Sequence, residues 1–82
     1  MRLPDIHKIY DVIDKMNAPF IMPDILLELR EPEWSYRDET YIKSQIRKAL
    51  SNQVKHGTIE RTGEVIPSGF GQDYIVYRRT AA

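Results

Sequence analysis

The stretch that decides the fold runs from Asp38 to Gly57 and reads DETYIKSQIRKALSNQVKHG. Apolar residues recur in it with the spacing of one helical face. Ser35 precedes it as a candidate N-cap, and Asp38 follows three positions later, as in a capping box. Gly57 suits the left-handed conformation that ends many helices. We therefore predict a helix over about 37–56, with an inner side made of Ile42, Ile46, Ala49, Leu50, Gln53 and Val54.

The outer side of this predicted helix contains no carboxylate. Asp38 and Glu39 fall toward the inner half of the first turn, where the helix dipole favours negative charge. On a wheel of about 100° per residue, the outer side carries bases, hydroxyl groups and a tyrosine. Its residues are Arg37, Thr40, Tyr41, Ser44, Arg47, Lys48, Ser51 and Lys55. Such a face suits nucleic acid. Arg and Lys side chains neutralise phosphates, and hydroxyl groups form hydrogen bonds with the nucleic-acid backbone or with the edges of the nucleobases. An ordinary solvated helix surface is the alternative interpretation.

The charge of the chain is zero overall but unevenly spread. Residues 1–34 hold four bases and seven acids, whereas residues 35–82 hold eight bases and five acids. The segment 35–57 carries the whole positive excess, with five bases against Asp38 and Glu39. A local patch of this kind can steer a polyanion even when the total charge cannot.

Length and composition narrow the class of protein. With 82 residues the chain is expected to form a single domain, 1–82. The absence of cysteine excludes a disulfide framework and cysteine-ligated zinc, and it fits a reducing cytosol. No apolar run approaches the roughly 18 residues of a membrane span, and the N-terminus lacks the apolar core of a signal peptide. We expect a cytoplasmic protein, associated with the nucleoid if it binds DNA.

Two further helices are predicted before the long one. An apolar stripe through Ile6, Ile9, Tyr10, Ile13 and Met16 indicates a helix over about 5–16. Pro23 begins a second helix over about 23–30, whose apolar side is Ile25, Leu26 and Leu29. Between the two helices, residues 20–22 (FIM) are expected to form a short strand.

After Gly57 the pattern changes to that of a β-hairpin over about 58–79. A turn near 67–69 would place Ile59 opposite Tyr77 and Arg61 opposite Ile75. Ile59, Ile75 and Tyr77 would then share one face of the hairpin. A shorter pairing with an open loop over 63–72 fits the sequence equally well.

This order of elements resembles the winged helix-turn-helix family of DNA-binding proteins, and the resemblance covers residues 4–79. LSNQVKHGTIERTG, from Leu50 to Gly63, resembles the family's passage from recognition helix to first wing strand. YIVYRR, residues 74–79, resembles the return strand. The resemblance implies an α+β fold of three helices and a C-terminal wing, with the third helix in the major groove. Carried over by position, the base readers would be Arg37, Thr40, Tyr41, Ser44 and Lys48, and the residues nearer the phosphates Arg47, Ser51 and Lys55, with Arg61 on the wing.

The predicted wing has no base between Arg61 and Arg78, although minor-groove wings normally offer Arg or Lys. Val65, Ile66 and Phe70 lie near its tip instead. They would pack against the body or across the hairpin, contact a protein partner or second copy, or form an apolar wedge in DNA.

The expected function is sequence-specific binding of double-stranded DNA by a small transcription regulator that represses by occupancy. A homodimer on a two-fold operator is compatible with this function. The alternatives are a winged-helix module for protein–protein contact, which uses the apolar wing tip, and an architectural DNA-binding accessory factor. We expect no enzyme, cofactor, small-molecule ligand or membrane partner. Two lone histidines, His7 and His56, do not suggest a metal site.

Overall fold

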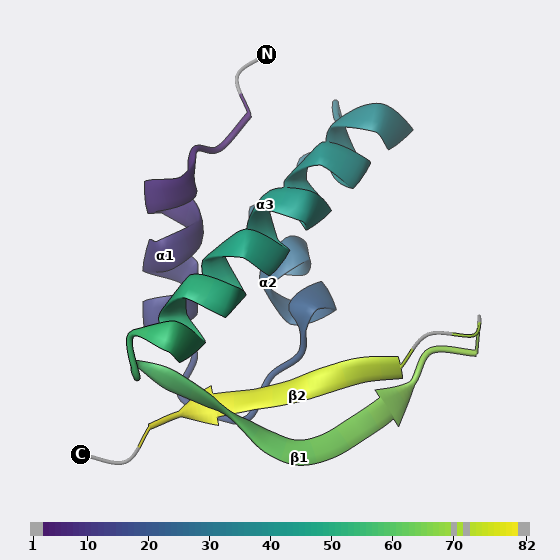
Figure 1. Ribbon diagram of the computed structural model, residues 1–82. Coiled ribbons are helices and arrows are strands. Elements are labelled where there is room, and N and C mark those ends of the chain that lie inside the picture. Colours follow the sequence, from purple (N-terminus) through teal and green to yellow (C-terminus); the bar gives the residue numbers. More distant parts are fainter. Residues whose placement is uncertain (1–2, 70, 72, 81–82) are drawn as a thin grey trace.

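The computed structural model describes residues 3–69, 71 and 73–80. The chain has an α+β fold in which three helices precede a two-stranded antiparallel hairpin. The elements are α1 (Ile6–Asp14), α2 (Met22–Leu29), α3 (Tyr36–Lys55), β1 (Ile59–Pro67) and β2 (Asp73–Arg79). Figure 1 shows α1 beside α3, α2 behind α3, and the hairpin running past the lower ends of the helices. The predicted order of helices and hairpin strands is therefore confirmed, with helix bounds shifted by one or two residues.

Short polar side chains cap the N-termini of α1 and α3, and the cap of α3 is the one that the sequence predicts. The Asp5 carboxylate accepts a hydrogen bond from the backbone N–H of Lys8 at 3.0 Å. At α3, the Ser35 hydroxyl accepts from the backbone of Asp38 at 3.2 Å, and the Asp38 carboxylate accepts from the backbone of Ser35 at 3.0 Å. This reciprocal capping box satisfies two backbone donors that the first turn of a helix leaves free.

The core lies where the three helices meet and extends to the base of the hairpin. The most deeply buried side chains are aliphatic and come from all three helices, at the positions that helical spacing predicts. Trp34, between α2 and α3, packs against the same cluster and is partly buried. The buried cluster contains Ile9, Val12, Ile13, Phe20, Ile25, Leu26, Leu29, Ile42, Ile46, Ala49, Leu50, Ile59 and Tyr77.

The predicted short strand over 20–22 is reduced to one bridge. Phe20 exchanges backbone hydrogen bonds with Tyr77 of β2, at 2.9 and 2.8 Å. Their rings stack with centroids 6.0 Å apart. Met22 already belongs to α2, because Pro23 suits the first turn of a helix and Asp24 accepts from the backbone of Ile21 at 2.9 Å. This bridge connects the hairpin to the segment between the first two helices.

Both predicted pairings of the hairpin were wrong. Ile59 lies opposite Arg79, Arg61 opposite Tyr77, and Val65 opposite Ile75. Pairing continues to Pro67 and Asp73, so there is no open loop over 63–72. The prediction that Ile59, Ile75 and Tyr77 share a face still holds, because the pairing is shifted by an even number of residues.

Two features produce the observed pairing. Val65, Ile66 and Pro67 pair with Ile75, Tyr74 and Asp73, so the turn lies between Pro67 and Asp73 and not at 67–69. A bulge in β1 then changes the register between Arg61 and Val65. Thr62, Gly63 and Glu64 lie opposite the single residue Val76. Gly63 has φ of 90°, a conformation that side-chain-bearing residues rarely adopt, and the Thr62 hydroxyl accepts from the backbone N–H of Glu64 at 3.1 Å. Extra residues in one strand bend it, and Figure 1 shows β1 bowed along its length.

Candidate nucleic-acid interface

The outer face of α3 presents the predicted contact residues to solvent. All of them are exposed, and the alternating pattern of buried and exposed residues along α3 follows the wheel. Ile42 and Ile46, on the opposite side, have no exposed surface. The residues of this outer face are Arg37, Thr40, Tyr41, Ser44, Arg47, Lys48, Ser51 and Lys55.

The two acids of α3 are held away from this face. Asp38 is occupied by the capping box with Ser35. Glu39 forms an ion pair with Arg30, at 3.4 Å from carboxylate oxygen to guanidinium nitrogen. Both acids are only partly exposed. The outer face therefore has the positive potential of its bases without a neighbouring carboxylate on the same helix to offset it.

Tyr36 is a candidate contact residue that the sequence patterns did not single out. It is the first residue of α3, and 85% of its surface is exposed. Its backbone carbonyl accepts a hydrogen bond from the Thr40 hydroxyl at 3.0 Å, one turn later. The sequence signal was available, because a residue directly after the N-cap Ser35 lies at the open end of the helix. An aromatic ring at this place can stack on a base or pack along a sugar.

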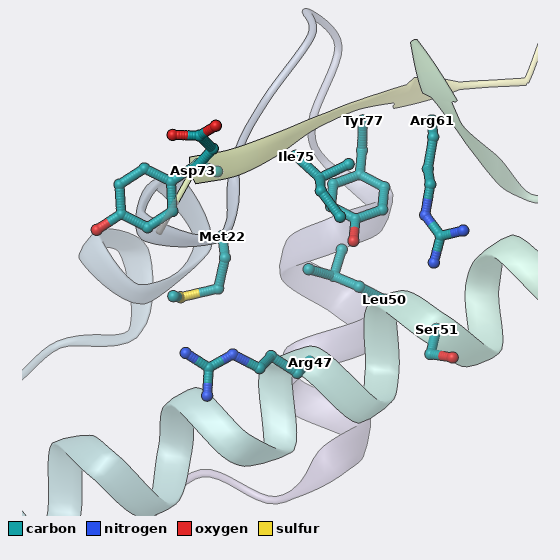
Figure 2. A pocket seen from close by; sticks show the side chains of 9 residues that line it. Met22, Arg47, Leu50, Ser51, Arg61, Asp73, Ile75 and Tyr77 are labelled. Atoms are coloured by element: carbon teal, nitrogen blue, oxygen red, sulfur yellow. The ribbon is translucent and has the colours of Figure 1, made fainter. Parts of the chain in front are cut away.

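A cleft of about 270 Å³ separates α3 from the hairpin. Figure 2 shows Arg47 and Ser51 on the α3 side, Met22 at one end, and Arg61 and Tyr77 on the hairpin side. Apolar side chains form much of its lining, and Asp73 stands near Met22. The lining comprises Met22, Arg47, Leu50, Ser51, Arg61, Asp73, Tyr74, Ile75 and Tyr77. The structure therefore brings together Arg47, Ser51 and Arg61, which the sequence assigned separately to helix and wing.

The arginines of the cleft differ from others in the chain. Arg30 is paired with Glu39, and Arg78 is paired with Glu60 at 2.9 Å. Within residues 3–69, 71 and 73–80, neither Arg47 nor Arg61 forms an ion pair. Their guanidinium groups thus retain all five donors each for a partner outside the chain.

The apolar residues of the outer hairpin are about half exposed. Val65 is 55% exposed and lies opposite Ile75, whereas Ile66 is 46% exposed and lies opposite Tyr74. The cross-strand pairs therefore cover them only in part, and they are not buried in the body. Phe70, assigned with them as a partner contact, lies outside the described residues.

The described residues contain no group of three or more His, Asp or Glu side chains that could hold a metal ion. Among the helices in the same part of the chain, none has the length and apolar character needed to cross a membrane. Comparison with protein-family models, curated proteins and solved structures produced no match for this chain. The site must therefore be judged from its own geometry.

Proposed function

We propose that this chain is a winged-helix protein that binds double-stranded DNA sequence-specifically. In this proposal α3 enters the major groove, and the protein acts as a small transcription regulator that represses by occupying its site. The width of the groove supports this placement of α3, because the major groove of B-DNA is wide enough to admit an α-helix. The exposed Arg37, Thr40, Ser44 and Lys48 would then reach base edges.

The observation that carries this proposal is the segregation of charge on α3. The bases and hydroxyls of its outer face are exposed together, whereas the carboxylates of Asp38 and Glu39 are bound to the Ser35 backbone and to Arg30. A solvated helix surface usually pairs its bases with acids one turn away on the same face. A face with bases and hydroxyls alone matches the donors that phosphates and base edges require.

The test is duplex binding by fluorescence anisotropy, with a labelled pool of random sequence, at two salt concentrations. A protein that contacts several phosphates should lose affinity steeply between about 50 and 200 mM salt. Arg47→Glu combined with Lys48→Glu should abolish binding. Because both side chains are exposed, the melting temperature should change little, with a stability effect within about 0.5 kcal/mol.

A matched control reverses the same amount of charge on another helix. Lys8→Glu combined with Lys15→Glu changes two exposed lysines of the α1 segment. This variant should keep most of its duplex affinity, because total charge alone should not determine binding. Equal losses in the two double variants would mean that α3 is not the contact surface, and wild-type affinity in the α3 variant would mean the same.

The exposed apolar hairpin supports a second candidate, a winged-helix module for protein contact. Val65 and Ile66 offer apolar surface that cross-strand pairing leaves about half open. A second copy of the chain would be one such partner and would double the length of DNA contacted. A longer contact would raise sequence specificity, because each mismatched base pair typically costs only about 1–3 kcal/mol of binding free energy.

Sedimentation separates the two candidates. Val65→Ser combined with Ile66→Ser should convert a wild-type dimer to monomer while leaving single half-site binding nearly unchanged. If wild type sediments as a monomer with and without duplex, the hairpin is not a self-association surface. If wild type self-associates but never binds duplex, the protein-contact module is favoured.

A further inference from the structure

The positive charge of the hairpin gathers at its base. Arg61, Arg78 and Arg79 belong to the residue pairs at the base of the hairpin. The outer part carries Glu64 and Asp73, and the sequence has no Lys or Arg between Arg61 and Arg78. Like charges repel, so the outer part of the hairpin is poorly suited to phosphate. Of the charged residues of the hairpin, Arg61 and Asp73 line the cleft against α3.

The position of Arg61 is set by the contact between the hairpin and the segment that joins α1 to α2. Arg61 lies opposite Tyr77, and Tyr77 is bonded through its backbone to Phe20. Figure 2 shows Arg61 descending from the strand toward Ser51, while the Arg47 side chain extends along α3 to the end of the cleft at which Met22 lies. Two guanidinium groups without an ion pair among the described residues therefore border one cleft from two different elements.

We infer that this cleft seats a segment of the sugar–phosphate backbone of the bound duplex, with Arg47 and Arg61 contacting phosphates from its two sides. The hairpin would then hold DNA by its base, beside α3, and its tip would not be the DNA contact. This inference rests on the proposed function and specifies which surface receives the backbone.

The arginines, the serine and the apolar lining of the cleft match this occupant, whereas the Asp73 carboxylate opposes it. Guanidinium groups form paired hydrogen bonds with phosphate oxygens, and the Ser51 hydroxyl can donate to the same backbone. Leu50, Ile75 and Met22 supply apolar surface for the sugar carbons.

The first experiment measures the salt dependence of duplex binding for Arg47→Gln, Arg61→Gln and the double variant. Each removed phosphate contact should lower the slope of log affinity against log salt by about 1, and the double variant should lose about 2. Arg61→Lys should recover most of the slope, because it restores the charge. Arg79→Gln is the matched control, since Arg79 is exposed and does not line the cleft.

The second experiment follows the Nε–H signals of Arg47 and Arg61 by NMR in the folded wild type. Both signals should shift when duplex is added, and inorganic phosphate at equal phosphate concentration should shift them far less. Equal shifts with inorganic phosphate would indicate a site for a free anion and would overturn the inference.

The outcomes also separate this inference from the proposed function. If Arg47→Gln lowers the slope but Arg61→Gln leaves it unchanged, α3 binds DNA without the hairpin base, and only the inference fails. If wild type shows no salt-dependent duplex binding, the proposed function fails and takes the inference with it. Thermal melts of each variant show whether a loss of binding comes from unfolding.

Discussion

Phe20 and Tyr77 exchange backbone hydrogen bonds of 2.9 and 2.8 Å and stack their rings 6.0 Å apart. Both side chains are buried, at 3% and 8% exposure. This contact joins the segment between α1 and α2 to the base of the hairpin. Since Arg61 lies opposite Tyr77, the contact also helps to set the distance between Arg61 and α3.

Phe20→Ala should therefore lower the free energy of unfolding by about 3–5 kcal/mol, the usual range for a buried phenylalanine. In a domain this small, the melting temperature should fall by well over 10 °C, at roughly 4–8 °C per kcal/mol. Phe20→Leu is the control and should lose less than about 1.5 kcal/mol if the neighbours repack. A loss below 1 kcal/mol for Phe20→Ala, measured by urea titration, would mean that this contact contributes little to stability.

Ile46→Ala and Tyr41→Ala test the orientation of α3. Ile46 has no exposed surface, so its truncation should leave a cavity and lower stability by about 2–4 kcal/mol. Tyr41 is 53% exposed, and its replacement should change stability by less than about 1 kcal/mol. Denaturant titrations that gave the reverse order would show that the outer face of α3 is wrongly assigned.

Ser35→Ala and Ser44→Ala make a matched pair with opposite expected effects. Ser35→Ala removes the side chain that caps α3 and should lower stability by about 0.5–2 kcal/mol. Ser44→Ala lies on the exposed face in mid-helix, where alanine is the better helix former, so stability should stay level or rise slightly. At a temperature where both variants are folded, Ser44→Ala should lower duplex affinity more than Ser35→Ala does. A stable Ser35→Ala variant would mean that the capping box is dispensable.

Asp73→Asn should strengthen duplex binding. Asp73 is an exposed carboxylate that lines the cleft, and it would repel a phosphate held by Arg47 and Arg61. Removing one nearby negative charge should raise affinity by about two- to fivefold at low salt, and the gain should shrink at high salt because exposed charges are screened. Glu33→Gln, an exposed acid that does not line this cleft, is the control and should change little. An unchanged affinity for Asp73→Asn would place the DNA backbone away from the cleft.

Local sequence patterns were sufficient to predict the helices. The stripe through Ile42 and Ile46 predicted the inner side of α3, and both are fully buried. The capping box of Ser35 and Asp38 formed as predicted, and Gly57 has the expected positive φ, at 80°. These features depend on contacts between residues a few positions apart, so neighbouring sequence specifies them. The expected outer face followed from the same periodicity.

The hairpin shows what local pattern cannot decide. Alternation indicated which residues share a face but not which residues lie opposite one another, because pairings that differ by an even number of residues satisfy the same pattern. The position of the turn, between Pro67 and Asp73, and the bulge at Gly63 together determined the pairing. The glycine within the strand was a local signal for the bulge.

The sequence by itself determined the three helices, their buried sides, and the caps and acid-free face of α3, because each arises within one segment of chain. Only the tertiary structure decided the pairing of β1 with β2, the contact of Phe20 with Tyr77, and the cleft between Arg47 and Arg61. These features join residues that are far apart in the chain. Their geometry depends on how the hairpin packs against the helices, and neither the period of a strand nor that of a helix contains this information.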